Sequence, residues 1–182
     1  NIAPSATFAM DAKAKAMRAA GENVIGFAAG EPDFDTPEPI RNAMKDALDR
    51  GMTRYTPVPG TIEIRDAIIE KLKRDNGLSY TREQIVVSNG AKHSLYTLFQ
   101  TILDKGDEVV IPTPCWVSYP EMVRMAGGTP VYVEAKEEDD FIPTAEAMRA
   151  AITPATKAFI LTSPNNPNGC VWPKEALQTL AA

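Results

Sequence analysis

Short apolar runs, rich in β-branched residues, alternate with helical stretches through most of this chain. The runs lie at Ile85–Val87, Glu108–Ile111, Pro130–Glu134 and Ala158–Leu161. Such alternation predicts βαβ units, and therefore an α/β fold with a mostly parallel sheet and helices on both of its faces. Sheets of this kind bind ligands in the crevice beyond the carboxyl ends of their strands. We therefore look for functional residues in the segments that follow the strands.

Apolar spacing and end signals predict the helices. They are expected at Thr7–Ala20, Pro37–Arg50, Ile62–Asn76, Ala91–Leu103, Tyr119–Ala126, Thr144–Ile152 and Pro173–Ala182. Gly21 and Gly77 are placed to end the first and third of these helices, and Thr36 is placed to cap the second, with Pro37 at its first helical position. Tyr55–Gly60 holds two prolines and a glycine and is predicted to be a loop.

Composition excludes several classes of protein. The 182 residues are 44% apolar and 24% charged, with a net charge of −5, which suits a globular protein and argues against nucleic acid as a partner. Cys115 and Cys170 form no CxxC pair, and His93 is the one histidine, so neither a metal site nor a disulfide framework is expected. The opening residues resemble no secretory signal, and no apolar stretch approaches the roughly 20 residues that cross a bilayer. We expect a soluble, cytoplasmic protein with no membrane partner.

The first candidate site is the segment Ser88–Lys92, between a predicted strand and a predicted helix. Free backbone N–H groups and the helix dipole make a helix start an anion site, and Gly90 and Ala91 leave room for a phosphate. Neither a GxGxxG fingerprint nor a Walker loop is present. A tight strand–helix turn without any ligand explains the segment equally well.

Two further candidates follow later strands. Trp116 comes after Pro112 and Pro114, which stiffen its loop, and an indole at a strand end can stack on a planar ligand. The alternative is a tryptophan packed into the core. Ser163–Gly169 is a run of turn-forming residues longer than a chain reversal needs, and its asparagine amides can donate to a phenolate or carboxylate. The alternative there is an elaborate Asx turn.

Together these motifs resemble a known family. Gly30–Phe34, Tyr55–Pro57 with Gly60, Asn89–Lys92, Trp116–Pro120 and Ser163–Gly169 are similar, in this order, to motifs of the class I (fold type I) pyridoxal-phosphate aminotransferases. The resemblance runs from about Pro4 to the end of the chain and is strongest to the bacterial aspartate (aspartate/prephenate) branch. It implies the type I PLP-transferase fold in truncated form. Residues 1–50 would form an amino-terminal arm and small-domain segment, and residues 51–182 the first half of the large, cofactor-binding domain.

The resemblance also implies a cofactor, pyridoxal 5′-phosphate, and residues that hold it. Gly90, Ala91 and Lys92 match the phosphate-binding segment, and Trp116 matches the residue that stacks on the pyridine ring. Asn166 matches the asparagine that bonds the ring's phenolic oxygen. Tyr55 matches a residue that reaches the partner subunit's cofactor phosphate, which implies a homodimer. By the same resemblance, the peptide bonds before Pro114 and Pro167 are expected to be cis.

Substrate residues follow in the same way. Gly30 matches a backbone contact to the α-carboxylate, and Trp116 and Asn166 match residues that also border the substrate. Lys92, helped by hydroxyls at Ser5 and Thr7, matches the group that selects an acidic side chain, because a fixed ammonium favours a distal carboxylate. Aspartate or glutamate and a 2-oxo acid are therefore the expected small-molecule partners, with prephenate also compatible. Alternatively, Lys92 only steadies the phosphate or points to solvent.

The family's imine-forming lysine, its pyridine-binding aspartate and its carboxylate-binding arginine match nothing here. No catalytic residue is therefore assigned in this chain, and Lys157 is not a substitute for the missing lysine. The sequence also stops inside a predicted helix. We expect an amino-terminal portion of a longer protein, inactive by itself.

Three other functions stay open at this point. An aromatic or alanine-type aminotransferase of the same fold would need Lys92 to be a bystander. A PLP lyase or synthase would need no keto-acid acceptor. A non-catalytic binding module would take up no PLP.

Overall fold

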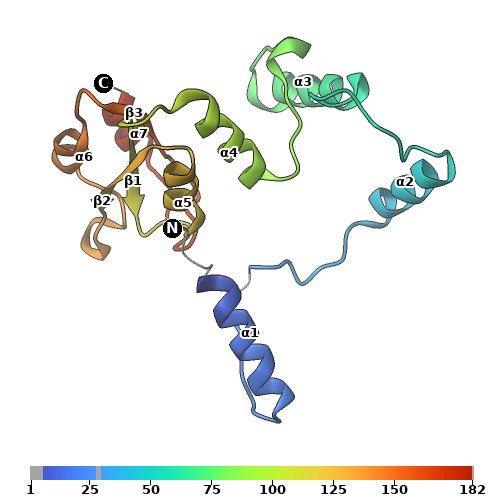
Figure 1. Ribbon diagram of the computed structural model, residues 1–182, viewed down its shortest axis with the longest axis horizontal. Helices are drawn as coiled ribbons and strands as arrows, with labels where there is room; N and C mark the ends of the chain where they lie inside the picture. The colour runs from blue at the N-terminus through green and yellow to red at the C-terminus, as the bar shows by residue number, and fades with distance from the viewer. Residues whose placement is uncertain (1–5, 28–29, 182) are drawn as a thin grey trace. The chain divides into compact units, whose positions relative to one another are not determined.

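The computed structural model describes residues 6–27 and 30–181 (Figure 1). Contacts divide the chain into two compact units. The helical unit runs from Ala14 to Ala91, and the sheet unit comprises Lys92–Ala182 together with the residues up to Lys13. The domain boundary expected near residue 50 does not coincide with either of these divisions. Contacts within this chain do not test it, so it stays a prediction.

The sheet unit is built on three parallel strands. These are β1 (Glu108–Thr113), β2 (Thr129–Glu134) and β3 (Thr156–Phe159), in the order β2-β1-β3. Val110 lies opposite Val131 of β2 and Phe159 of β3, and the register against β3 is irregular between Glu108 and Val109. The predicted parallel sheet is confirmed.

Both faces of the central strand are covered. Val109, Val110 and Ile111 are each 0% exposed, and neighbouring residues of a strand point to opposite faces. On the face of Val109 and Ile111 the core cluster includes Phe99 from α4 and Met122 and Val123 from α5. Those helices span Ala91–Ile102 and Ser118–Met125.

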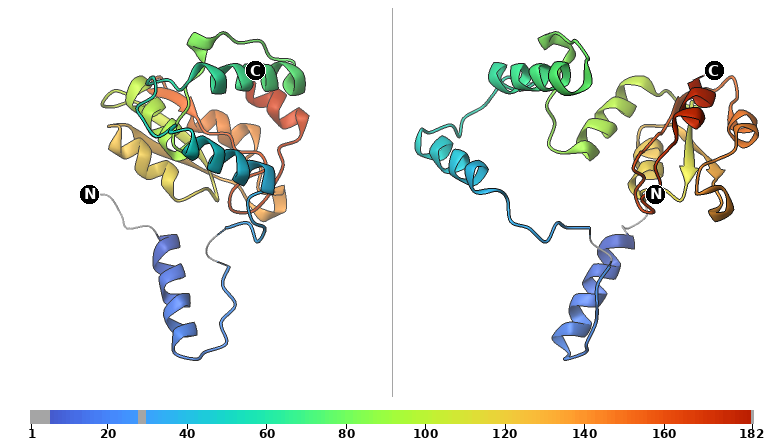
Figure 2. Two further views of the ribbon diagram at one scale, coloured as in Figure 1. Left: turned by 90° about the vertical axis from the view of Figure 1, so that its right-hand side faces the viewer. Right: turned by 180° about the vertical axis from the view of Figure 1, so that it is seen from behind.

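The other face is covered by the chain's last helices. Phe159 shares a face with Val110, its register partner, and its ring meets that of Trp172 edge-on at 6.3 Å. Helix α6 (Ala145–Ala151) contacts β2 and also packs against α7 (Lys174–Ala181). Figures 1 and 2 show α5 and α6 on opposite sides of the sheet. The expected helix layers on both faces are therefore present.

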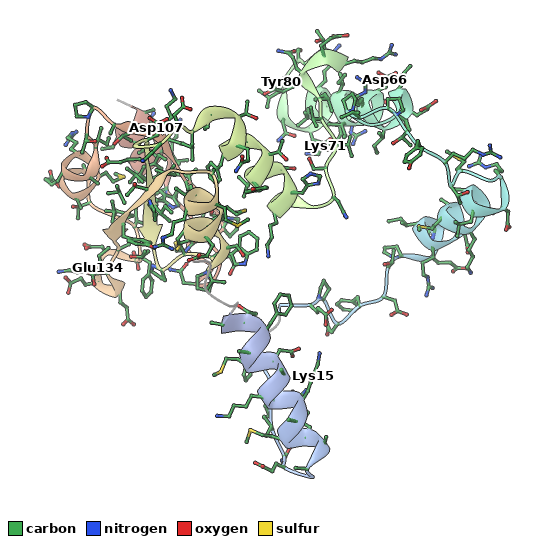
Figure 3. All side chains as sticks on the ribbon, viewed as in Figure 1. Lys15, Asp66, Lys71, Tyr80, Asp107 and Glu134 are labelled. Atoms are coloured by element: carbon green, nitrogen blue, oxygen red, sulfur yellow. The ribbon has the colours of Figure 1, made fainter. Side chains whose placement is uncertain are left out.

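The sheet's direction fixes where the strands end. Asp107, directly before β1, accepts a hydrogen bond from the amide of Thr129 at the start of β2. Glu134 is the last residue of β2. Figure 3 labels Asp107 and Glu134 at opposite ends of the sheet. The segments that leave β1, β2 and β3 therefore begin at the Glu134 end.

The helical unit has few tertiary contacts of its own. It contains α2 (Glu38–Asp49), α3 (Ile62–Asn76) and the short 3₁₀ helix η1 (Arg82–Gln84), while α1 (Ala6–Ala19) begins before it. The Thr61 hydroxyl accepts from the amide of Ile64 and caps α3, and Gly77 ends that helix with φ +67°. The predicted helix at Ile62–Asn76 is confirmed with its capping glycine.

Three local predictions are wrong. Ile85–Val87 is not a strand. Across to another segment it makes a single backbone hydrogen bond among the described residues, from the Val87 amide to the Pro59 carbonyl. A strand needs a ladder of such bonds, and Val86 is 66% exposed. Helix α2 begins at Glu38, with Pro37 as its N-cap residue and no side-chain cap from Thr36. Strand β3 begins at Thr156 and ends at Phe159, two residues earlier than expected.

None of the helices within residues 6–27 and 30–181 combines the length and apolar character that a membrane crossing requires.

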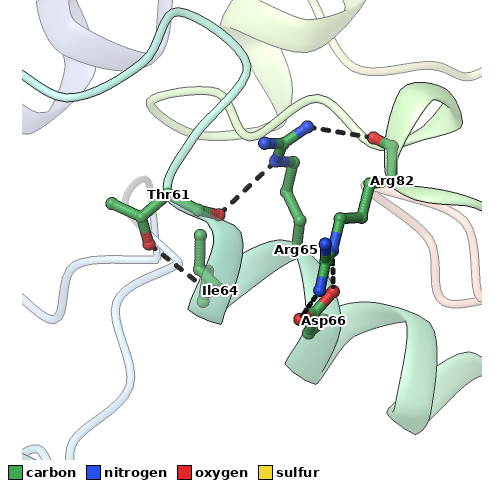
Figure 4. Close-up of polar contacts among 5 residues, drawn as sticks. All are labelled: Thr61, Ile64, Arg65, Asp66 and Arg82. Carbon is green, nitrogen blue, oxygen red and sulfur yellow. Dashed lines mark hydrogen bonds and ion pairs between the residues drawn. The ribbon is translucent and has the colours of Figure 1, made fainter.

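One ion pair joins α3 to η1. The Arg82 guanidinium donates to both carboxylate oxygens of Asp66, at 2.5 and 2.6 Å, and Arg65 donates to the Arg82 carbonyl at 3.2 Å (Figure 4). The hydrogen bonds from Arg82 hold the pKa of Asp66 below its ordinary value. The bidentate geometry fixes the orientation of this pair, which joins the two elements together with the bond from Arg65.

Replacing Asp66 with asparagine tests this tie. A carboxylate whose folded pKa is lowered stabilises the fold at neutral pH, and that contribution disappears as the pH falls through its folded pKa. We expect faster amide hydrogen exchange in α3 and η1 of Asp66→Asn than of the parent at pH 7. The difference should vanish at a pH below the ordinary Asp66 value of 3.8.

Asp75→Asn is the matched control, because Asp75 pairs with its own neighbour Arg74 and joins no second element. It should leave the exchange rates of η1 unchanged. Equal exchange rates in the parent and Asp66→Asn at pH 7 would contradict the assignment.

Candidate functional site

The segment after β1 presents an indole that is held on two sides. Trp116 is half-buried and meets the ring of Tyr119 edge-on, with 5.3 Å between ring centroids and 87° between planes. Tyr119 is itself buried, at 8% exposed. The Trp116 indole therefore packs against a residue of the core.

The start of α4 reaches the same indole. The Lys92 ammonium lies over the Trp116 ring, 4.8 Å from its centroid, which is cation–π geometry. Lys92 is the second residue of α4 and is exposed. The first and second candidate segments therefore meet through these two side chains.

The loop after β3 is tied to the Trp116 loop by two hydrogen bonds. The Asn165 amide donates to the Pro114 carbonyl at 3.0 Å, and the hydroxyls of Tyr119 and Thr162 lie 2.9 Å apart. Pro114 is two residues before Trp116, and Asn165 is next to Asn166. The contact between Lys92 and Trp116 and the bond between Asn165 and Pro114 therefore bring the three candidate segments together.

A small pocket marks the place where these loops meet. It is lined from both strand ends, with Pro114 and Cys115 on one side and Thr162, Asn165 and Cys170 on the other. Burial raises the pKa of the Cys115 thiol. Asn166 itself is exposed and is not part of this lining.

The other residues predicted to bind cofactor or substrate lie elsewhere in the chain. Gly30 is exposed, and Tyr55 has a fully exposed ring in the helical unit. Thr7 is half-buried in α1, and Ser5 lies outside the described residues. Their expected roles stay predictions.

One backbone prediction for these segments is confirmed. The peptide bonds before Pro114 and Pro167 are cis, and so is the one before Pro164. Gly90 has φ +82°, and a Cβ built on it would meet nothing within 4 Å, so its backbone is open on the side where a side chain would stand. The α4 amides begin at the next residue.

The residues present suit a flat ring that bears a phosphate. Trp116 offers an indole face, Asn166 an exposed side-chain amide, and the first residues of α4 offer backbone N–H groups and the Lys92 ammonium, whereas the Gly90 amide already donates to the Ser88 carbonyl at 2.9 Å. Aromatic stacking, a donor to a ring oxygen and an anion site are the chemistry that such a group requires.

Sequence reasoning missed the residues that join the loops. Asn165, Tyr119 and Thr162 carry the hydrogen bonds between strand ends, yet only Asn166 of the asparagine pair was given a role. Both asparagines stand in the same motif, and nothing in the sequence tells which of them turns toward the neighbouring loop. The buried position of Tyr119 could have been inferred from its helical spacing to Met122 and Val123.

Comparison with known proteins assigns this arrangement to a family. The chain matches the family described as Aminotransferase class I and II over residues 22–182. It is 54% identical over 180 residues to the aspartate aminotransferase of Bacillus sp. (strain YM-2), covering 99% of this chain and 46% of that protein. It is 53% identical to the aspartate/prephenate aminotransferase of Thermus thermophilus, covering 98% and 46%.

Solved structures agree. The aspartate aminotransferase from Thermus thermophilus with maleate has a TM-score of 0.95 at 53% identity, over 99% of this chain and 47% of that one. The aspartate aminotransferase from Rhizobium meliloti has a TM-score of 0.92 at 44% identity, over 100% and 45%. The chain thus spans about half the length of the curated relatives it matches.

Replacing Tyr119 with phenylalanine tests the tie between the loops. The variant keeps the edge-on contact with Trp116 but loses the hydrogen bond to Thr162, so we expect the free energy of unfolding to fall by about 0.5–1.5 kcal/mol. Urea unfolding followed by tryptophan fluorescence measures it, since both tryptophans lie in the sheet unit.

Tyr132→Phe is the control, because Tyr132 is 49% exposed and its hydroxyl bonds Arg124 at the surface. It should change the stability by less than about 0.5 kcal/mol. Tyr119→Phe being tolerated as well as Tyr132→Phe would argue against a structural tie at Tyr119.

Proposed function

The chain belongs to the class I and II aminotransferase family, and from this membership we propose that the whole protein is an aspartate aminotransferase using pyridoxal 5′-phosphate. It would exchange the amino group of aspartate or glutamate with a 2-oxo acid by a ping-pong route. The observation that carries the proposal is the Lys92 ammonium over the Trp116 indole. This pair combines a stacking surface with a cation suited to a dicarboxylic substrate.

For the cofactor, the proposal gives each group of this chain one task. The amides of Ala91 and Lys92 at the start of α4 bind the phosphate, next to Gly90, which leaves room for it while its own amide donates to the Ser88 carbonyl. Trp116 stacks on the ring, and the Asn166 amide donates to its phenolic oxygen. The bound cofactor supplies an aldehyde and an electron-withdrawing ring that hold the transferred amino group. Tyr55, exposed in this single chain, would reach the cofactor phosphate of the partner subunit in a homodimer.

For the substrate, Lys92 is the selecting group. Its ammonium attracts a distal carboxylate and would be left unpaired by an apolar side chain. The hydroxyls of Ser5 and Thr7 would assist, and the Gly30 backbone would bind the α-carboxylate. Relatives carry the names aspartate and aspartate/prephenate aminotransferase, and one relative's structure is described with maleate, a dicarboxylate. Prephenate, another dicarboxylate, is therefore a second candidate substrate.

The chain contributes binding groups but no assigned catalytic residue. Lys157 lies in β3 with its side chain exposed. In the sequence it is far from the segments that carry Lys92 and Trp116. We therefore propose that the imine-forming lysine lies in a part of the protein outside this sequence. The 182 residues alone should transfer no amino groups.

Lys92→Ala in a complete enzyme that carries this sequence tests the substrate assignment. We expect kcat/KM for aspartate to fall about 10- to 100-fold, which is the usual loss when a hydrogen bond to a charged group is removed. The value for an apolar donor such as alanine should not fall. Coupled assays with 2-oxoglutarate as acceptor measure both.

Lys157→Ala serves as the control and should leave both values unchanged. A Lys92→Ala enzyme that keeps its preference for aspartate would contradict the role of Lys92 and favour an aromatic or alanine-type enzyme. Failure of the unaltered holoenzyme to change its absorbance on addition of aspartate would contradict aspartate as its amino donor.

A further inference from the structure

The two proposed cofactor-binding loops are joined at one side chain. Asn165 donates from Nδ2 to the Pro114 carbonyl at 3.0 Å and to Oδ1 of Asn168 at 2.9 Å. An asparagine amide has two N–H donors, so both are used. One bond stays within the Asn166 loop, and the other crosses to the loop that carries Trp116.

The backbone of Asn165 is fixed as firmly as its side chain. Its amide donates to the Cys170 carbonyl at 2.9 Å, and its carbonyl accepts from the Gly169 amide at 2.8 Å. The Asn168 side chain also accepts from the Cys170 amide, at 3.2 Å. Asn165 therefore cannot shift without disturbing the whole loop between Ser163 and Cys170.

The position of this bond connects the two groups that face the ring. Trp116 is two residues beyond Pro114, and Asn166 is the residue after Asn165. Since Pro114 has no N–H, its carbonyl is the one backbone group through which that residue can hydrogen-bond. Among the residues that the structure describes, the Asn165–Pro114 bond lies closer along the chain to Trp116 and Asn166 than the Tyr119–Thr162 bond does.

We propose that Asn165 is a positioning residue: its amide sets the separation between the Trp116 ring and the Asn166 amide, and so the affinity of the site for the cofactor ring. This rests on the proposed function, because it takes Trp116 and Asn166 as the ring-binding pair. Asn165 itself touches no ligand. A ring held between two loops binds more tightly when those loops are already at the right distance, because ordering them then costs nothing.

The binding experiment uses the 182-residue chain with Trp172→Phe, which leaves Trp116 as the one tryptophan. The probe is pyridoxine 5′-phosphate, which has the ring and phosphate but an alcohol in place of the aldehyde, so it forms no imine with lysines. Quenching of Trp116 fluorescence gives Kd, and urea unfolding gives stability separately.

Asn165→Asp keeps the side chain's size but removes both donors, and Asn165→Ala removes the amide without adding charge. Each should raise Kd about five- to tenfold, the effect expected for one hydrogen bond. Asn168→Ala is the matched control. It removes the other acceptor of Asn165 in the same loop but leaves the bond to Pro114, so it should lower stability without raising Kd.

The outcomes separate the two proposals. If the parent shows no quenching, the groups of this chain do not hold the ring and the positioning role fails, whereas the absorbance of the holoenzyme tests the proposed function separately. If the parent binds and the Asn165 variants bind equally well, the site stands and the positioning role fails. If Asn168→Ala weakens binding as much as the Asn165 variants, Asn165 only supports the fold of the loop and the proposal is overturned.

A measurement on the chain with Asn165 intact covers the case in which the Asn165 variants do not fold. If the bond favours ligand binding, the ligand must stabilise the bond by the same factor. Saturation with pyridoxine 5′-phosphate should therefore slow hydrogen exchange of the Asn165 side-chain amide at least fivefold. An unchanged rate would overturn the proposal.

Discussion

Parallel pairing of β1 with β3 is the constraint on which the site depends. Two parallel neighbours release their chains at the same edge of the sheet, so the Trp116 loop and the Asn166 loop begin side by side although some fifty residues separate them. That pairing is held in place because Val109, Val110 and Ile111 are fully buried between the helix layers. Two hydrogen bonds then join the segments that follow these strands, one between the hydroxyls of Tyr119 and Thr162 and one from the Asn165 amide to the Pro114 carbonyl.

The indole of Trp116 connects the core to the exposed part of the site. Its edge-on contact with buried Tyr119 orients it, and the Lys92 ammonium occupies a position over its ring. The lysine on the first turn of α4 and the indole after β1 are therefore joined by a cation–π interaction. Lys92 thus lies beside the proposed ring site, where the proposed function also has it attract a substrate's distal carboxylate.

Much of this could be predicted from the sequence. The alternation of β-branched runs and helices predicted the parallel sheet, and Gly77 correctly marked the end of α3. Ile85–Val87 failed because a strand is defined by its partners: the Ile85 amide donates to the nearby Arg82 carbonyl, and the Val87 amide donates to the Pro59 carbonyl, which is no ladder. A local run of β-branched residues does not show whether a neighbouring strand is there to pair with it.

The segments that meet could be predicted from the sequence, but the bonds between them could not. Motifs identified Lys92, Trp116 and the asparagine loop, and the structure joins them. The choice between Asn165 and Asn166 as the residue that crosses to Pro114 depends on the direction of the side chain in a tight loop. That direction follows from tertiary packing, which no local pattern encodes.

The central claim is that a flat ring bearing a phosphate lies against Trp116 and beside Asn166. Nuclear Overhauser effects between pyridoxine 5′-phosphate and the isotope-labelled chain test it most directly. The account predicts cross-peaks from the ligand's ring methyl group to the Trp116 indole and from the ligand to the Asn166 side-chain amide. Cross-peaks confined to other residues, or to Trp172 in place of Trp116, would contradict it.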